Sequence, residues 1–233
     1  MNKTIPLIFT LAVSSGLSQD ARAWPWENAA PVVDSQVKPG SDRIGGDLSF
    51  LRDRHGQSAQ RRLDGQYKLV YFGAAHSISL VPGQNASPQN NSCAIDLLVL
   101  EEARKEVGRR CGQSVSDRLS ALFIYPSPRL SDPPPYNLRT YLDVPGSHIL
   151  GLHAPIEDIL SLGRRYAVRY LQDKQSDVVT GHTRFTYLMG PDGKNLAIFP
   201  ADMADPAGVI AKQIIRSMSL DNFALPDTPE CSR

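Results

Sequence analysis

The sequence lacks a strong excess of charge of either sign. Its 25 Lys and Arg residues nearly balance 24 Asp and Glu residues, which leaves a formal net charge of +1. Proteins that bind nucleic acid through its phosphates carry a marked basic excess, so this balance gives no indication of a nucleic-acid partner. The 233 residues, 41% of them hydrophobic, are typical of one globular domain with a single sizeable core.

The apolar run near the start of the chain is too short to span a bilayer as a helix, which needs about 20 apolar residues. Lys3 precedes this run, Ile5–Leu17 is mostly apolar, and Ala21-Arg22-Ala23 has the small-x-small pattern of a cleavage site. We therefore predict a secretory signal peptide at residues 1–23 and a periplasmic or secreted mature protein that begins at Trp24. The alternative is that the run stays in place as a membrane anchor.

Cysteine is scarce, and its odd number leaves at least one thiol unpaired within the chain. The three cysteines are Cys93, Cys111 and Cys231. If Ala94–Gly108 is helical, Cys93 and Cys111 lie roughly 25 Å apart at about 1.5 Å per residue, far beyond the reach of a disulfide. We therefore expect a Cys111–Cys231 bridge and a free Cys93. The alternative is that Cys111 is a small buried apolar residue and that Cys231 lies in a frayed tail.

A predicted strand, loop and helix form the unit around which the rest of the chain is organised. The apolar run Leu69–Phe72 predicts a buried strand that stops at Gly73. After a polar loop, Ala94–Gly108 carries Leu97, Leu100, Ala103 and Val107 at three- and four-residue spacing, which is one apolar face of a helix. Cys93 stands at the start of this helix, where unpaired N–H groups and the helix dipole stabilise a thiolate.

The remaining elements are consistent with an α/β fold. Further strands are predicted at Leu119–Tyr125, Ile149–Leu152, Thr183–Met189 and Leu196–Phe199. Further helices are predicted at Tyr136–Leu142, Pro155–Tyr166 and Pro206–Met218, the last with Val209, Ile210, Ile214 and Met218 on its apolar face. The order favours a thioredoxin-like sandwich, a central mixed sheet flanked by helices, with an N-terminal hairpin extension at Ile44–Gly56. Residues 24–43 are predicted to be an extended lead-in, 44–219 the domain and 220–233 an irregular tail.

Several segments together indicate a family. The clearest is Gly181–Gly193, with the sequence GHTRFTYLMGPDG, and others are IGGDL at Ile44–Leu48 and YFGAAH at Tyr71–His76. From about Ile44 to Met218 the chain resembles the SCO/SenC copper-chaperone family of the thioredoxin superfamily. The resemblance implies copper handling in the assembly of a respiratory oxidase. It also implies an oxidase subunit or another copper-assembly protein as the partner.

The resemblance implies which residues would hold copper. In that family two cysteines of a CPxxC-type loop and one distant histidine bind a single copper ion, a donor set that suits both Cu(I) and Cu(II). The family's histidine falls on His182, although Gly181 stands where the family has an aspartate. The implied ligands here are Cys93 and His182, with His76 as an assisting group.

One cysteine of the family's pair is missing. Ser77 stands at the place of the first cysteine, and Cys93 at the place of the second, with Ile78–Ser92 inserted between them. Aligning the second cysteine on Val81 instead would place Pro82 in a helix interior, where proline costs about 3 kcal/mol. Two protein ligands are few for tight copper binding, so the metal site is degenerate.

Two other functions compete with copper handling. The chain is a metal-free binding module if the loop 78–92 recognises an assembly partner, because long ordered loops on a rigid scaffold often carry recognition. It is a one-cysteine thiol enzyme if Cys93 acts with an external thiol. No base with an orienting partner accompanies Cys93 in the sequence, so no catalytic residue is assigned.

Overall fold

The computed structural model describes residues 44–74, 92–127, 142, 148–172, 179–201 and 203–231. Several predicted features lie outside these ranges: the signal peptide, the lead-in, His76, Ser77 and nearly all of the inserted loop. The helix predicted at Tyr136–Leu142 also lies outside them, apart from Leu142 itself.

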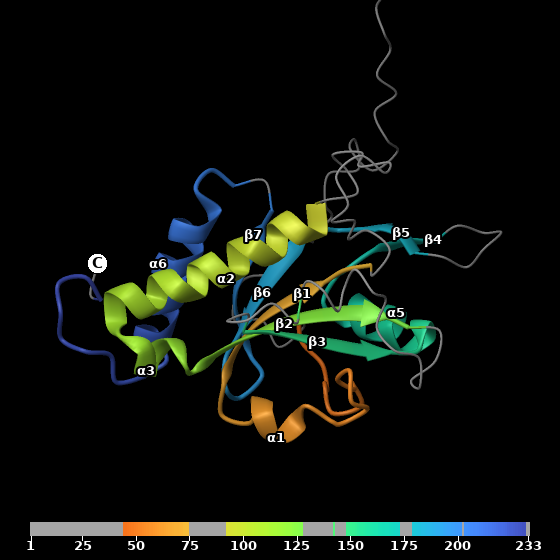
Figure 1. The fold of residues 1–233 in the computed structure, drawn as a ribbon, viewed down its shortest axis with the longest axis horizontal. Helices are drawn as coiled ribbons and strands as arrows, with labels where there is room; N and C mark the ends of the chain where they lie inside the picture. Colours follow the sequence, from red (N-terminus) through yellow and green to blue (C-terminus); the bar gives the residue numbers. More distant parts are fainter. Residues whose placement is uncertain are drawn as a thin grey trace, which may run out of the picture. The chain divides into compact units, whose positions relative to one another are not determined.

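A five-stranded sheet with the order β3-β2-β1-β6-β7 forms the centre of the domain (Figure 1). Its strands are β1 (Tyr67–Phe72), β2 (Leu119–Pro126), β3 (Ile149–Ala154), β6 (Phe185–Met189) and β7 (Asn195–Pro200). The first three run parallel, whereas β6 pairs antiparallel with β1 and β7 antiparallel with β6. The predicted mixed sheet is therefore confirmed.

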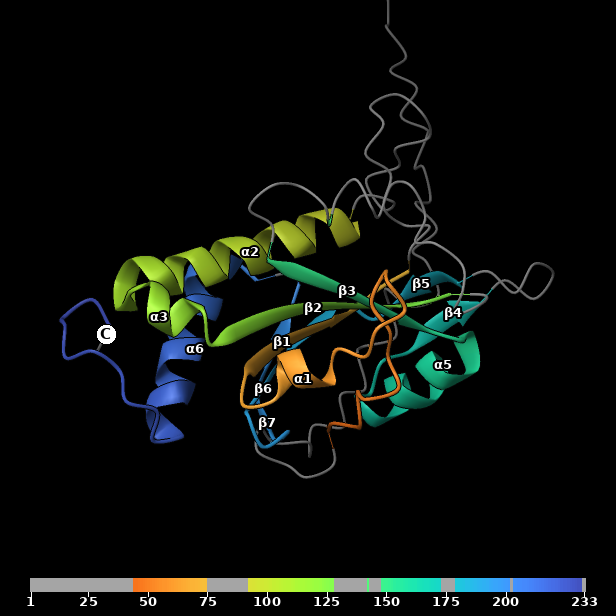
Figure 2. The ribbon, with the colours of Figure 1, turned by 60° about the horizontal axis from the view of Figure 1, so that its bottom comes forward.

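Helices cover both faces of this sheet. They are α1 (Gln60–Leu63), α2 (Ser92–Cys111), α3 (Gln113–Ser116), α5 (Ile156–Arg165) and α6 (Pro206–Leu220). Figures 1 and 2 show α2 lying beside α6 on one face, and α1 and α5 lying on the other. None of the helices in the described ranges has the length and apolarity that crossing a membrane requires.

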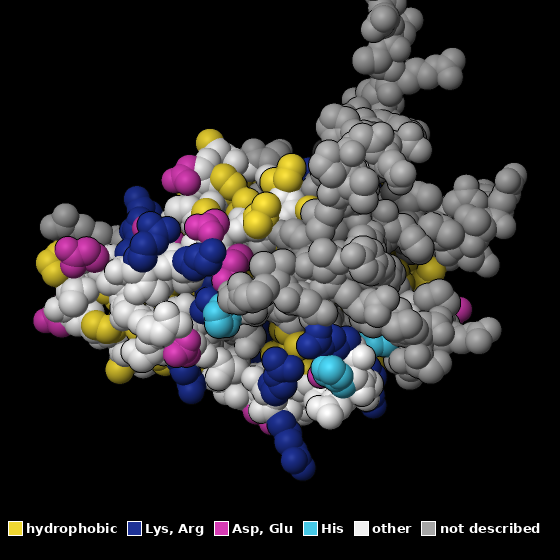
Figure 3. All heavy atoms as spheres, in the orientation of Figure 1, with side chains coloured by type: hydrophobic (Ala, Val, Ile, Leu, Met, Phe, Trp, Pro, Cys, Tyr) yellow, Lys and Arg dark blue, Asp and Glu magenta, His cyan; other side chains and the backbone are white. Residues whose placement is uncertain are grey.

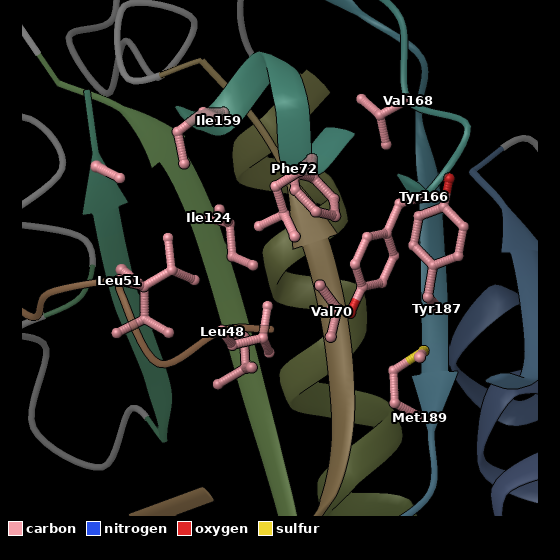
Figure 4. Packing of buried hydrophobic residues seen from close by; sticks show 14 of the residues in the cluster. Leu48, Leu51, Val70, Phe72, Ile124, Ile159, Tyr166, Val168, Tyr187 and Met189 are labelled. Atoms are coloured by element: carbon pink, nitrogen blue, oxygen red, sulfur yellow. The ribbon is translucent and has the colours of Figure 1, made fainter. Parts of the chain in front are cut away.

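The central strand β1 is buried on both of its faces. Val70 and Phe72 pack on the α5 side with residues of β2 and β6, as Figure 4 shows. Leu69 and Tyr71 point to the opposite side, toward α2 and α6. This burial explains why the strand is a continuous apolar run instead of an alternating one.

The predicted apolar face of α2 is confirmed, because Leu97, Leu100, Ala103 and Val107 are all fully buried. The helix is longer than predicted and takes in Cys93 as its second residue. The opposite face carries Ile95 and Leu98, each more than half exposed, and Figure 3 shows hydrophobic side chains gathered over this helix.

The predicted face of α6 is partly wrong. Ile210, Ile214 and Met218 are buried as expected, but Val209 is 43% exposed. The reason is the width of the buried stripe, which continues through Ala211 and Ile215 and so leaves Val209 on the solvent side. Asp205 begins the helix by accepting a hydrogen bond from the backbone N–H of Gly208.

The predicted N-terminal hairpin is not formed by strands. Within Ile44–Gly56 only Arg52 makes bridges, one to Ser58 and one to His153 of β3. The side chain of Asp53 accepts hydrogen bonds from two backbone N–H groups of the turn that follows. These bonds hold the chain in a tight turn, so the pairing does not extend into a ladder.

The C-terminal tail has no helix or strand between Asp221 and Cys231, but it packs on the domain. A disulfide joins Cys231 to Cys111 at the end of α2, and both residues are buried. The hydroxyl of Tyr67 donates a hydrogen bond to Asp221, and its ring meets Phe223 edge to face.

A second, two-stranded sheet of β4 (Tyr170–Gln172) and β5 (Val179–His182) carries the chain to the candidate site. The sequence analysis did not predict these strands, which have only three and four residues. Tyr170 lies directly opposite His182 in this sheet, and His182 is the last residue of β5.

Candidate metal centre

Cys93 and His182 are brought together although they lie 89 positions apart in the sequence. The distance from Cys93 Sγ to His182 Nε2 is 3.0 Å. Cys93 is fully buried and His182 is half-buried. The sulfur comes from the first turn of α2 and the ring nitrogen from the end of β5, so the fold places a thiol and an imidazole face to face.

The second ring nitrogen fixes how the imidazole carries its protons. His182 Nδ1 lies 3.0 Å from the carbonyl oxygen of Thr183, which only accepts hydrogen bonds, so Nδ1 carries a proton. Nε2 then faces the sulfur and either accepts the thiol proton or donates to the thiolate. The ring of Tyr71 packs edge to face against the imidazole, with centroids 5.7 Å apart.

The surroundings favour the charged forms of both groups. Burial raises the pKa of Cys93, but His182, the hydroxyl of Tyr71 and the backbone of Ala74 together lower it below its ordinary value. Burial lowers the pKa of His182, but the hydrogen bond and the charge of Cys93 lead the groups that raise it above its usual range. Both shifts act in the direction of a thiolate beside an imidazolium, and the start of α2 adds the favourable end of a helix dipole.

We expect this bias to be visible in the pH profile of thiol alkylation. Cys93 is the free cysteine of the protein, so iodoacetamide reports on one site. Half-maximal reactivity should fall at a lower pH than for an ordinary cysteine thiol, because the pKa of Cys93 is lowered by its surroundings. His182→Ala removes the largest stabilisation of the thiolate and leaves the effect of burial, so the midpoint should move upward. His55→Ala is the matched control, because His55 is exposed on a distant turn; equal midpoints in all three proteins would contradict this assignment.

The carboxylate of Asp96 and the guanidinium of Arg184 lie close to Cys93 and His182 and are linked to them through Tyr71. Asp96, three residues after Cys93 on α2, is buried and accepts a hydrogen bond of 2.5 Å from the hydroxyl of Tyr71. Arg184 donates to both oxygens of Asp96, from Nε at 2.9 Å and from Nη2 at 2.6 Å. The Tyr71 hydroxyl also lies 3.8 Å from Cys93 Sγ.

The sequence analysis did not single out Asp96 or Arg184. The available signals were their positions, one helical turn after Cys93 and two residues after His182. These signals are weak without the fold, because nothing in the sequence shows that the two segments meet.

Other predicted residues lie elsewhere or outside the described ranges. His76, Ser77 and residues 78–91 of the inserted loop lie outside them. Two other histidines lie away from this site: His153 is buried in β3 and stacks on Tyr125, and His55 is exposed at its turn. Among the described residues, no group of three or more His, Cys, Asp and Glu side chains is arranged to hold a metal ion.

The donor set of the site fits copper chemically but is incomplete. A thiolate is a soft ligand that suits Cu(I), and an imidazole nitrogen suits both oxidation states. His182 Nε2 and Cys93 Sγ face each other across a hydrogen bond. A metal ion bound by both atoms would take the place of the proton in that bond. A further donor has to come from outside the described ranges or from another molecule.

The mixed sheet and the thiol in the first turn of the helix that follows β1 define a thioredoxin-like α/β protein. The SCO1/SenC family model matches residues 36–219, and the chain belongs to this family. It is 26% identical over 166 residues to Protein sco1 of Schizosaccharomyces pombe, a match that covers 69% of this chain and 56% of that protein.

Solved structures agree on the fold. The crystal structure of Arabidopsis thaliana ScoI with copper bound superposes with a TM-score of 0.57 at 21% identity, covering 76% of this chain and 99% of that one. BsSco, described as a member of the Sco family of cytochrome c oxidase assembly proteins, superposes with a TM-score of 0.52 at 15% identity, covering 78% of this chain and 99% of that one.

Proposed function

We propose that this protein handles copper outside the cytoplasm during assembly of a respiratory oxidase, with Cys93 and His182 as its own copper ligands. The observation that carries the proposal is the 3.0 Å approach of Cys93 Sγ to His182 Nε2. Copper is here a cargo that is received and passed on. Family membership and the copper-bound relative support the proposal.

The incomplete donor set suits transfer better than storage. With two ligands from the described residues, a third donor comes from His76, which lies outside the described ranges, or from the partner that delivers or accepts the ion. A partner ligand that enters the coordination shell before the ion leaves would make transfer direct. An oxidase subunit or another copper-assembly protein fits this role.

The proposed compartment agrees with the cysteine chemistry. Disulfides persist in oxidising compartments such as the periplasm, and the structure has a bridge between Cys111 and Cys231. The signal peptide predicted at residues 1–23 would deliver the chain there. The bridge lies at the far end of α2 from Cys93, so oxidation of that pair leaves the candidate ligand reduced and free.

Copper(I) titration against a competing chelator tests the proposal. The purified protein should bind one copper ion per chain and release the proton that lies between Cys93 Sγ and His182 Nε2, because both atoms must be free of it to bind the metal. Binding should therefore weaken as the pH falls. Cys93→Ser and His182→Ala should each abolish it, and His55→Ala should not. Absence of binding in the wild type, or equal binding in all variants, would remove the metal and leave the metal-free binding module.

A further inference from the structure

The Asp96–Arg184 pair connects the two segments that carry the candidate ligands. Asp96 lies on α2 one turn after Cys93, and Arg184 lies two residues after His182, in the link between β5 and β6. Both Asp96 oxygens are engaged by the guanidinium, at 2.9 and 2.6 Å. A fork of two parallel bonds fixes orientation as well as distance, which a single ion pair does not.

Tyr71 adds a third element to this connection. Its hydroxyl donates to Asp96 Oδ2 at 2.5 Å, and its ring packs edge to face on the imidazole of His182. Tyr71 is fully buried in β1, the central strand, so it is the fixed reference against which α2 and the β5–β6 link are held. The three side chains together, called the clamp below, are Tyr71, Asp96 and Arg184.

We propose that this clamp positions His182 against Cys93 and so preorganises the site before any ligand arrives. His182 ends β5, where it pairs with Tyr170, and the link Thr183–Arg184 that follows it belongs to neither sheet, because β6 begins at Phe185. Among the described residues, the backbone of this link bonds to Arg169 and Ala201, and neither of these belongs to α2. The side chain of Arg184 therefore supplies the direct tie from this link to the helix that carries the sulfur.

The two charged residues of the clamp, Asp96 and Arg184, differ in how far they are exposed to solvent. Asp96 has a side chain that is 7% exposed, whereas that of Arg184 is 40% exposed. The buried carboxylate is thus neutralised by a cation that reaches it from the surface. The guanidinium of Arg184 therefore lies near Cys93 and His182 without adding net charge there, because Asp96 neutralises it. Asp96 and Arg184 are positioning residues in this account, because neither is a donor to the metal.

The test uses the copper-free protein first. In an imidazole-labelled sample, the ¹⁵N chemical shifts of His182 report whether Nε2 is bonded to the sulfur. Arg184→Met and Asp96→Asn should move these shifts toward those of a solvated histidine, and Arg184→Lys, which keeps the charge with a single donor, should move them less. Arg110→Met is the matched control, because Arg110 pairs with Glu106 on the same helix at its far end.

The second readout rests on the proposed function. Copper(I) affinity should fall roughly 10- to 100-fold in Arg184→Met and Asp96→Asn, as for other groups that orient a metal ligand, and should be unchanged in Arg110→Met. Thermal unfolding measured beside it separates positioning from stability. Wild-type His182 shifts in both clamp variants would overturn the proposal, whatever their stability. A wild type that binds no copper would refute the proposed function, while the shifts of the copper-free protein would still decide whether the clamp exists.

Discussion

Cys231→Ala is expected to lower the free energy of unfolding by about 4 to 5 kcal/mol, because it removes the bridge to Cys111. The two cysteines are separated by 120 positions. In the chain-entropy model, a bridge that closes a loop of about 100 residues stabilises the folded state by about 4.7 kcal/mol by restricting the unfolded chain. The bridge encloses the whole of α3, β2, β3 and all later elements, so its loss frees most of the domain's length in the unfolded state.

Urea unfolding followed by circular dichroism measures this effect. The control is the wild-type protein treated with a reductant, which opens the same bridge without removing a side chain. Its free energy of unfolding should fall by a similar amount. Cys111→Ala and the double variant Cys111→Ala/Cys231→Ala should both match Cys231→Ala, because each removes the same interaction and the losses do not add. A loss below about 1 kcal/mol would contradict this prediction and would show that packing on the domain holds the tail without the bridge.

The bridge also bears on the candidate site through α2. It fixes the C-terminal end of this helix, and Cys93 occupies the first turn at the other end. Reduction is therefore expected to loosen the tail and the end of α2 while the thiol–imidazole distance stays under the control of the clamp. The stability of the domain and the geometry of the site depend on opposite ends of one helix.

Much of this fold was predictable from local pattern. The apolar face of α2 was correct at every position named, because the 3.6-residue period survives in a helix that packs on one side only. The same period failed for Val209, because α6 buries a wider stripe whose centre is displaced from the predicted one. Strands β4 and β5 were missed because three or four residues are too few to show alternation.

Some residues of the candidate site were likewise predicted from the sequence, and others were missed. Cys93 and His182 were found because one begins a helix and the other stands in a motif, both of which are properties of the sequence. Asp96 and Arg184 were missed because their significance arises from a contact between residues 88 positions apart. A bidentate ion pair of this kind is formed by the tertiary arrangement, and neither residue type is unusual at its own position.

Glu101→Met and Arg104→Met are each expected to destabilise the protein by about 3 to 5 kcal/mol, whereas the double variant should lie within about 1 kcal/mol of the wild type. Both side chains are buried on α2, at 10% and 6% exposure, and are paired at 3.3 Å. Removing one partner leaves the other as an uncompensated charge away from water, and removing both leaves apolar side chains of similar size in an apolar setting.

The pair is incompletely satisfied, which favours the near-neutral double variant. Arg104 Nη1 donates to Ser116 on α3 at 2.8 Å, but Glu101 Oε2 and Arg104 Nε have no hydrogen-bond partner among the described residues. Guanidinium unfolding measures the three free energies. Replacing the exposed pair Glu102 and Lys105, which has the same spacing on α2, is the matched control, with single changes below about 1 kcal/mol. A double variant as unstable as either single variant would mean that the ion pair itself stabilises the α2–α3 contact. Because this pair does not touch the clamp, the double variant should also retain the His182 ¹⁵N shifts and the copper affinity of the wild type.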